Sequence, residues 1–243
     1  MKKHLSRFLL VALAVSLLAP GCLARDAAAD ALKRQERYTV SLELEFSKKN
    51  PNALDRVITF LDWGANGYAT GFVVGDGLIM TAYHVVSGEL SGYKKLALGF
   101  AADDQLEVKV HANGCHAKVL KVDKDADLAL LEVHCSLKQT KTPAFQLSVN
   151  KDDKLLLIAR PHGDSIVRKG TLMGSYSMNG LQFWSAKLNA RDGFSGSPVY
   201  NEQAELVGVM SGYDPSRKLA LISPGARAQK LLEDYLPSSK ATK

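Results

Sequence analysis

The sequence lacks the features of repetitive and nucleic-acid-binding proteins. Its 243 residues contain no low-complexity segment and no internal repeat of solenoid length. The formal charge is +6, but three of these charges lie in an N-terminal segment that we expect to be removed, which leaves +3. So small an excess, not concentrated in a block, gives no electrostatic basis for nucleic acid binding. With 46% hydrophobic and 23% charged residues, the composition is typical of a globular protein with one large or two small domains.

The apolar run at the N-terminus is too short to span a membrane. Phe8–Ala19 has only Ser16 as a polar residue and falls short of the ~20 residues that a transmembrane helix needs. Because the basic residues Lys2, Lys3 and Arg7 precede or flank it, the run is typical of a secretory signal peptide. We therefore assign residues 1–24 to a signal peptide and expect an exported protein.

The cleavage site of this signal has two alternatives. The stretch from Leu18 to Cys22 is similar to a bacterial lipobox, in which Cys22 would become the lipidated first residue of a membrane-anchored lipoprotein. A lipobox usually has Leu three residues before the cysteine and Ala or Ser two before, whereas this chain has Ala19 and Pro20. The alternative is ordinary cleavage after Ala24. Either outcome predicts export to the bacterial periplasm, the surface of a cell-envelope membrane or the medium.

Cysteine is scarce, and beyond the N-terminal one only Cys115 and Cys135 remain. An even pair in an oxidising compartment favours a disulfide. If the chain between them folds as a hairpin centred on Asp125, the two cysteines face each other, and opposed residues have Cα atoms roughly 4.5–5.5 Å apart, within disulfide range. A metal site that adds His116 and His134 is the alternative. Successive strand residues point to opposite faces, so these four side chains would not converge, and we predict the disulfide.

Short runs of β-branched and aromatic residues, separated by turn signals, cover most of the chain. This pattern is typical of an all-β barrel or sandwich. The expected strands are 57–61, 69–74, 78–82, 95–100, 106–111, the two arms of the cysteine hairpin, 154–158, 171–175, 182–187, 198–200 and 206–211. We assign residues 25–54 to a tether, 55–236 to the folded domain and 237–243 to a C-terminal tail.

One helix is expected, near the C-terminus. Ser223 is suited to its N-cap and Pro224 to its first position, and Pro237 is expected to end it. Between them an apolar stripe repeats at helical spacing, in Ala228, Leu231, Leu232 and Tyr235. We expect this stripe to pack on the body of the domain.

Three short segments carry residue types that act together in catalysis. His84 ends the stretch Thr-Ala-Tyr-His, Asp127 opens the apolar run Asp-Leu-Ala-Leu-Leu, and Ser195 lies in Gly-Phe-Ser-Gly-Ser-Pro. Each has a structural explanation by itself: a structural histidine, a solvated carboxylate in a hairpin turn, or a flexible glycine-flanked loop. Together they supply a nucleophile, the base that activates it and the acid that orients the base.

The order His, Asp, Ser discriminates between catalytic families. Subtilisin-type enzymes have the order Asp, His, Ser, and α/β-hydrolases have Ser, acid, His. The loop also departs from the hydrolase G-x-S-x-G elbow, because Ser197 stands where the second glycine is required. Glycines flanking Ser195 fit a loop that turns its backbone N–H groups inward. The N–H groups of Gly193 and Ser195 would then form an oxyanion hole.

These motifs resemble those of the trypsin-like (chymotrypsin-fold) serine peptidases. Residues 71–86 and 193–201 are similar to the bacterial branch that includes HtrA-type and glutamyl-endopeptidase-type enzymes, and Arg160-Pro-His-Gly-Asp164 resembles the family's Gly-x-Pro-x-Gly turn. For residues 55–236 the resemblance implies an all-β fold of two six-stranded antiparallel β-barrels with a C-terminal α-helix. The active site would lie between the barrels, with His84 and Asp127 from the first and Ser195 from the second. The resemblance implies a polypeptide substrate, with no cofactor and no metal.

Two departures from the family pattern are informative. Phe194 stands where the family usually has Asp or Asn before the nucleophile. An Asp there serves activation by a newly freed N-terminus, so Phe194 argues against that kind of activation and leaves open how the oxyanion loop is held. The chain also ends soon after the expected helix, which leaves no room for the PDZ domain that most HtrA-type proteins carry.

The expected substrate edge is Met210, Ser211, Gly212 and Tyr213, an extended segment that would pair with a peptide by strand addition. Glutamyl-specific relatives place a His just before this edge, whereas this chain has Met210, so specificity for Glu is not supported. Tyr213 stands where a small residue usually keeps the first pocket open. We therefore expect a shallow pocket and small or aliphatic P1 residues.

Two functional hypotheses follow. The first is an exported serine endopeptidase, a hydrolase that forms an acyl-enzyme on Ser195 with His84 as base and Asp127 as orienting acid. The second is a catalytically silent pseudo-peptidase that binds extended peptides in the cell envelope. Phe194 favours the second hypothesis, and the complete set of catalytic residue types favours the first. The sequence leaves the oligomeric state open.

Overall fold

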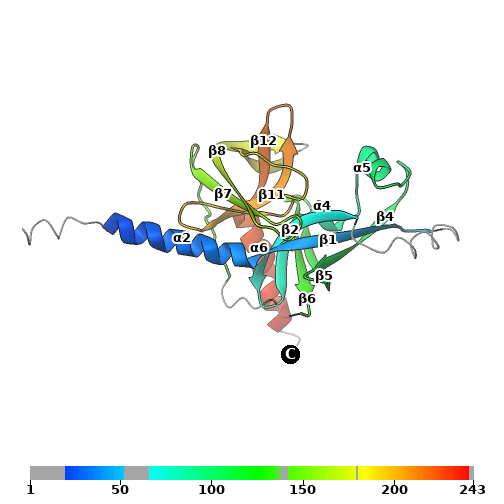
Figure 1. Ribbon diagram of the computed structural model, residues 1–243, viewed down its shortest axis with the longest axis horizontal. Coiled ribbons are helices and arrows are strands. Elements are labelled where there is room, and N and C mark those ends of the chain that lie inside the picture. The colour runs from blue at the N-terminus through cyan, green and yellow to red at the C-terminus, as the bar shows by residue number, and fades with distance from the viewer. Residues whose placement is uncertain (1–19, 52–65, 136, 138–141, 179, 241–243) are drawn as a thin grey trace, which may run out of the picture.

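Two closed β-barrels follow each other along the chain and form the body of the protein (Figure 1). The computed structural model describes residues 20–51, 66–135, 137, 142–178 and 180–240, with side chains described between 29 and 236. Every strand pair within the two barrels is antiparallel. The predicted all-β architecture of two six-stranded barrels is confirmed.

The first barrel closes in the order β1-β2-β3-β6-β5-β4. Its strands are β1 (Thr39–Lys48), β2 (Gly67–Gly75), β3 (Leu78–Thr81), β4 (Leu106–Ala112), β5 (Cys115–Asp123) and β6 (Leu128–Val133). The second barrel closes in the order β10-β11-β12-β9-β8-β7. Its strands are β7 (Lys154–Ala159), β8 (Ile166–Met178), β9 (Leu181–Lys187), β10 (Pro198–Tyr200), β11 (Leu206–Asp214) and β12 (Leu219–Pro224).

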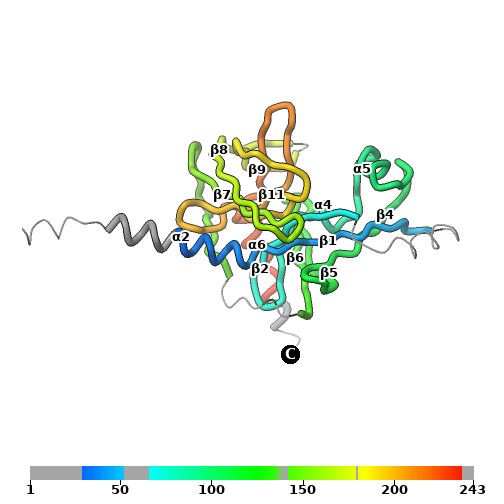
Figure 2. The backbone as a smooth tube through the Cα atoms, in the orientation of Figure 1, coloured from blue at the N-terminus to red at the C-terminus, as the bar shows by residue number. Residues whose placement is uncertain are grey.

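Strand β1 corrects the prediction that residues 25–54 form a tether. Val40, Leu42, Leu44 and Phe46 are buried, while the residues between them are partly or fully exposed. This period-two alternation is that of a half-buried strand, and β1 joins β2 to β4 to close the barrel. The N-terminal part of the predicted tether is the helix α2 (Pro20–Tyr38), which extends outward from the body and leads directly into β1 (Figures 1 and 2). The predicted strand 57–61 lies outside the described residues.

Two other local predictions are wrong. Residues 95–100, predicted as a strand, belong to the helix α5 (Gly92–Ala97) and the turn after it, and the Ser91 hydroxyl caps that helix by accepting a hydrogen bond from the Lys94 N–H. Ser223 and Pro224 end strand β12 rather than start a helix. The C-terminal helix α6 (Gly225–Lys240) begins just after them and continues past Pro237.

The apolar core has three parts. One fills the first barrel and one the second. The third lies between the barrels, where Phe72 and Leu128 of the first barrel meet Ile158 and Val209 of the second. Helix α6 covers this shared core, and its predicted apolar stripe supplies three fully packed residues, Ala228, Leu231 and Leu232. Since neither barrel can bury these side chains alone, the packing fixes the relative position of the two barrels.

Among the helices in the described ranges, none combines the length and apolar character that crossing a membrane would require.

The β5–β6 hairpin carries the predicted disulfide. Ala117 pairs with Val133 and Lys118 with Glu132, which is the register expected for a centre at Asp125. Nearer the turn the register shifts by one residue between Val119 and Lys121, so the prediction holds only for the outer part of the hairpin. Cys115 and Cys135 extend this register and are joined by a disulfide, with their Cα atoms 6.3 Å apart. The sulfurs are therefore engaged with each other, and the prediction of a disulfide rather than a metal site is confirmed.

Removal of this disulfide is expected to lower stability without moving the triad. The bond closes a loop of 20 residues in sequence separation, and a loop of this size contributes about 3 kcal/mol by restricting the unfolded chain. Urea unfolding of a Cys115→Ala, Cys135→Ala double variant should show a loss of that size. Reductant should destabilise the parent protein and leave the double variant unchanged. Equal stability of the parent and the double variant would contradict this expectation.

Candidate active site

His84 is positioned by a short helix that follows β3. The strand ends at Thr81, Ala82 keeps extended backbone, and α4 (Tyr83–Val86) begins at the next residue. The Tyr83 N–H donates to the carbonyl of Asp127 at 3.1 Å, which joins the start of α4 to the β5–β6 turn. Val85 is buried and anchors the helix, whereas the His84 side chain keeps 41% of its surface exposed. The imidazole is therefore fixed at its base and accessible at its ring.

Asp127 lies in a turn whose backbone conformation directs its carboxylate to α4. Its φ is +52°, a left-handed conformation that Asp tolerates better than most residues. The Asp123 carboxylate closes the turn by accepting a hydrogen bond from the Ala126 N–H at 3.1 Å. Arg227 of α6 in turn donates to both oxygens of Asp123, at 2.7 and 2.8 Å. The second part of the chain therefore supports the turn that presents Asp127.

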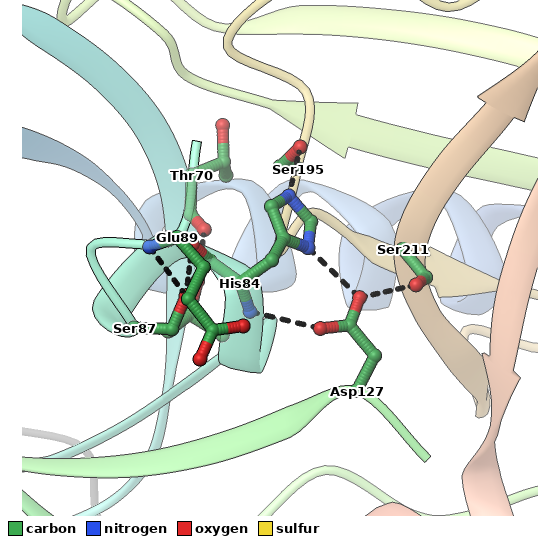
Figure 3. Close-up of polar contacts among 8 residues, drawn as sticks. Thr70, His84, Ser87, Glu89, Asp127, Ser195 and Ser211 are labelled. Atoms are coloured by element: carbon green, nitrogen blue, oxygen red, sulfur yellow. Dashed lines mark hydrogen bonds and ion pairs between the residues drawn. The ribbon is translucent and has the colours of Figure 1, made fainter. Parts of the chain in front are cut away.

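The three side chains predicted as catalytic meet in one line of hydrogen bonds (Figure 3). Asp127 accepts at Oδ1 from the His84 backbone N–H and at Oδ2 from Nδ1, both at 2.8 Å. An ionised carboxylate only accepts hydrogen bonds, so Nδ1 carries the proton and Nε2 is left as an acceptor. The Ser195 hydroxyl lies 2.8 Å from Nε2 and donates to it. His84 and Asp127 come from the first barrel and Ser195 from the second, as predicted.

Ser211 contributes a contact that sequence reasoning did not find. Its hydroxyl donates a hydrogen bond to Asp127 Oδ2, the same oxygen that accepts from His84 (Figure 3). The β11–β12 register shifts between Met210 and Gly212, so Ser211 occupies a β-bulge. Bulges re-aim side chains next to active sites, and this one turns a residue of the predicted substrate edge toward Asp127. No feature of the sequence signals the bulge.

The backbone before Ser195 forms a turn that determines where the predicted oxyanion donors point. The Phe194 N–H donates to the carbonyl of Arg191 at 3.2 Å, and Gly193 has a φ of +84°. Asp192, the second residue of this four-residue turn, is not among the residues with positive φ, and Gly193, the third, is. A positive φ at the third position only is the pattern of a type II turn. In the described part of the chain, the N–H groups of Gly193 and Ser195 donate to no backbone carbonyl. Both predicted donors are thus free to bind an oxyanion.

Phe194 is an internal part of this loop. Its side chain is 1% exposed and packs in the core of the second barrel, and the Arg191 guanidinium lies over its ring at 5.6 Å. A buried aromatic ring anchors the turn by packing, where the family's usual Asp or Asn would do so by polar contacts. Phe194 therefore anchors the loop through packing in the core.

Two glycines of the loop have no space for a side chain. A Cβ on Gly193 would overlap Pro161, from the predicted 160–164 turn, and one on Gly196 would overlap the Thr81 hydroxyl and the Thr70 carbonyl. Both glycines also have positive φ, at +84° and +82°. The flanking glycines, which the sequence analysis assigned to a loop with inward N–H groups, also allow the nucleophile loop to pack against the first barrel.

A cavity of about 280 Å³ opens beside His84 and Ser195. All four residues of the predicted substrate edge line it, and so do Ala190, Arg191, Asp192 and Lys94 of α5, which sequence reasoning did not single out. Met210 is buried, and Tyr213 keeps 40% of its surface exposed. The cavity is thus walled by the nucleophile loop on one side, the β11 edge on another and α5 on a third.

The hairpin that follows Tyr213 is held by Asp214. Its Oδ1 accepts from the Ser216 hydroxyl and from the N–H groups of Ser216 and Arg217, and its Oδ2 accepts from the Tyr176 hydroxyl. The hydrogen bond from Ser216, followed by that from Tyr176, lowers the pKa of Asp214 to about 2. The same contact with Asp214 raises the pKa of Tyr176. Charge on Asp214 therefore stabilises the hairpin next to the cavity.

The contribution of Asp214 to stability should disappear only in strong acid. Because its folded-state pKa of about 2 lies below the ordinary value of 3.8, its stabilisation is present above about pH 4 and is lost as the pH falls toward 2. Urea unfolding of the parent and of Asp214→Asn should differ at pH 6, and the difference should shrink below pH 4. Asp103→Asn, a change at an exposed carboxylate outside the hairpin, is the control. A pH-independent difference between parent and Asp214→Asn would contradict the assignment.

Within the described ranges, no three His, Cys, Asp or Glu side chains converge as metal ligands would.

Comparison with known proteins gives a family model and a set of similar structures. The model, described as the trypsin-like peptidase domain, matches residues 69–209. A search of curated proteins gives no match. The active form of the Rv3671c protease from M. tuberculosis has a TM-score of 0.59 at 16% identity, with 84% of this chain and 82% of that chain covered. Its inactive form has a TM-score of 0.55 and Deg5 one of 0.57, each at 16% identity with coverage of 84% and 91%.

Proposed function

The chain belongs to the trypsin-like peptidase family, and we propose that it is an exported serine endopeptidase with His84, Asp127 and Ser195 as its catalytic triad. The family membership confirms the resemblance that the three motifs indicated. The observation that carries the proposal is the continuous hydrogen-bonded line from Asp127 through His84 to Ser195. A base 2.8 Å from a serine hydroxyl, and itself oriented by a carboxylate, is the arrangement that activates serine as a nucleophile.

In the first half of the reaction, Ser195 Oγ attacks the carbonyl carbon of the scissile peptide bond while its proton passes to His84 Nε2. The new C–O bond produces a tetrahedral oxyanion, which the N–H groups of Gly193 and Ser195 stabilise. The oxyanion collapses, the C–N bond breaks, and the leaving amine takes the proton from Nε2. Asp127 holds Nδ1–H throughout and stabilises the imidazolium. The acyl group remains as an ester on Ser195.

In the second half, water repeats the sequence. His84 Nε2 removes a proton from the water as its oxygen attacks the ester carbonyl, and the same N–H groups bind the second oxyanion. Collapse of that intermediate breaks the bond to Oγ and returns the proton to Ser195. The carboxylic acid product leaves, and the residues are regenerated without any cofactor.

A polypeptide substrate would add to the free edge of β11. On one side, residues Gly212–Asp214 pair with Leu219–Leu221 of β12. On the other side, β10 pairs no further than Val209, so within the described ranges no strand covers that edge of residues 211–214. An extended peptide could form main-chain hydrogen bonds there and place its P1 side chain in the adjoining cavity. Such binding does not require a free chain end, which favours endopeptidase activity.

The N-terminal segment and the disulfide support the exported location. Residues 1–24 have the pattern of a signal peptide, and disulfides persist in oxidising compartments. We place the protein in the bacterial periplasm or, if Cys22 is lipidated, on a membrane of the cell envelope. Mass analysis of the N-terminal peptide after expression with the full signal tests this. A diacylated peptide beginning at Cys22 or an unmodified one beginning at Arg25 would support export, and an intact Met1 start would contradict it.

A fluorophosphonate probe should label Ser195. The probe forms a covalent bond to Oγ only when the base has activated it, so labelling mapped by mass spectrometry reports an assembled triad. We expect His84→Ala to abolish labelling, and Asp127→Asn to slow it by about 10⁴-fold because the wrong imidazole tautomer is then favoured.

The matched control for this experiment is His111→Ala, a histidine on β4 outside the site, which should label like the parent. Folding of every variant is checked by circular dichroism. If the folded parent protein stays unlabelled, the endopeptidase proposal fails and the peptide-binding pseudo-peptidase becomes the better explanation.

Cleavage of a mixed peptide library should show small or aliphatic residues at P1. The expectation rests on Met210 and Tyr213, two large side chains that line the cavity beside the β11 edge. A Tyr213→Gly variant should admit larger P1 residues and raise their kcat/KM relative to alanine by about 10-fold or more. A parent preference for Arg, Lys or Glu at P1 would contradict the prediction.

A further inference from the structure

Thr70 is a residue of the first barrel whose buried hydroxyl contacts only the loops around the nucleophile. It lies on β2 beside Ser195 (Figure 3), and it is fully buried. Its hydroxyl donates to the carbonyl of Gly193 at 2.9 Å and accepts from the N–H of Arg160 at 3.0 Å. Both partners belong to the second barrel. The buried hydroxyl therefore uses both its donor and its acceptor across the junction between the barrels. Because each hydrogen bond requires a particular direction, the two bonds together fix the orientation of the Thr70 side chain.

The backbone of Thr70 reinforces the same junction. Its N–H donates to the carbonyl of Ser195 at 2.9 Å. Its own carbonyl accepts from the Thr81 hydroxyl at 2.8 Å and lies against Gly196. Thr70 of the first barrel thus bonds to two carbonyls of the nucleophile loop. The Gly193 carbonyl belongs to the peptide group before Phe194, and the Ser195 carbonyl belongs to the peptide group after Ser195.

The peptide group that Thr70 holds is part of the oxyanion turn. The Gly193 carbonyl and the Phe194 N–H share one planar peptide. That N–H donates to Arg191 and that carbonyl accepts from Thr70, so the plane is fixed at both ends. Within the described ranges, the Thr70 hydroxyl is the only side chain that donates a hydrogen bond to a backbone carbonyl of residues 190–196. Phe194 has no polar group with which to do so.

From this geometry we propose that Thr70 is a positioning residue for the oxyanion hole, and that its hydroxyl supplies the polar restraint that Phe194 lacks. The inference rests on the proposed function, because it assigns the N–H groups of Gly193 and Ser195 to an oxyanion. Thr70 touches neither substrate nor nucleophile with its side chain. It acts through the orientation of the 193–194 peptide, and hence through the direction of the two N–H groups next to it.

The role predicts a specific kinetic effect of Thr70→Val, which keeps the shape of the side chain and removes the hydroxyl. Loss of one oxyanion donor costs about 10²–10³ in kcat, and loss of a restraint on both donors should cost about 10–100-fold. The loss should appear in kcat, with KM changed by less than about twofold, because the donors act in the transition state. Thr70→Ser retains the hydroxyl and should recover most of the activity.

The experiment compares Thr70→Val and Thr70→Ser with Thr39→Val. Thr39 is the matched control, since it is also buried in the first barrel and its hydroxyl donates at 3.0 Å to Gln35 of α2, away from the site. Three measurements are made on the full mature protein: the rate of fluorophosphonate labelling, steady-state kinetics (kcat and KM) on the best peptide of the library, and thermal stability. Thr39→Val should lose stability and keep the parent's labelling rate and kcat.

A fourth measurement does not depend on activity. Hydrogen exchange of a peptide covering residues 190–197 reports the turn directly, through the N–H groups of Phe194, Gly196 and Ser197 that are bonded in the parent. Exchange should become at least about tenfold faster in Thr70→Val and stay unchanged in Thr70→Ser and Thr39→Val. If the parent protein proves inactive, the proposed function fails while this exchange still decides whether Thr70 holds the turn.

The proposal is overturned if Thr70→Val labels, turns over and exchanges like the parent. It is also overturned if Thr70→Ser loses as much activity as Thr70→Val, because the methyl group or the packing would then be the important feature. If Thr39→Val loses as much kcat as Thr70→Val, the loss reflects general destabilisation, and the proposal is likewise overturned.

Discussion

The active site depends on the apolar core that the two barrels share. Phe72, Met80, Leu128 and Leu130 of the first barrel pack against Ile158, Tyr200, Leu206 and Val209 of the second. Directly beside this core, one hydrogen bond of 2.8 Å joins the base of one barrel to the nucleophile of the other. Since an error of about 1 Å in such a geometry costs around 10²-fold in rate, close packing at the junction is a condition of the chemistry. A close-packed interior allows little displacement of either barrel.

Helix α6 and the N-terminal helix both support this junction. Arg227 of α6 holds the turn that carries Asp127, and the same helix closes the shared core. From the other end of the chain, Leu32 of α2 packs on that core. The fully buried Tyr200, whose pKa burial raises, donates its hydroxyl to Gln35 at 3.3 Å. The later part of α2, from Leu32 to Gln35, is thereby part of the folded domain.

The local errors in reading the sequence have separate physical causes. β1 was missed because the charged residues on its exposed face resemble those of a linker, although its buried apolar residues alternate from Val40 to Phe46. Residues 95–100 have Leu96, Leu98 and Phe100 at the alternating positions of a strand, but the Ser91 cap starts a helix at Gly92, and among the described residues no strand pairs with this segment. In both cases the conformation of the segment depends on whether another strand lies beside it in the sheet. The local residue pattern does not contain that information.

The sequence motifs indicated the family and the order His, Asp, Ser of the proposed triad, the family resemblance implied the two-barrel fold, and the cysteine spacing predicted the disulfide. Each of these depends on residue types at fixed short spacings, such as the glycines beside Ser195 or the register of the cysteine hairpin. Tertiary structure alone decided the left-handed turn at Asp127, the bulge that turns Ser211 to it, and the restraint of Gly193 by Thr70. The Ser211–Asp127 contact joins residues 84 positions apart, and the Thr70–Gly193 contact joins residues 123 positions apart. Their directions follow from how the barrels pack against each other, which a short motif does not specify.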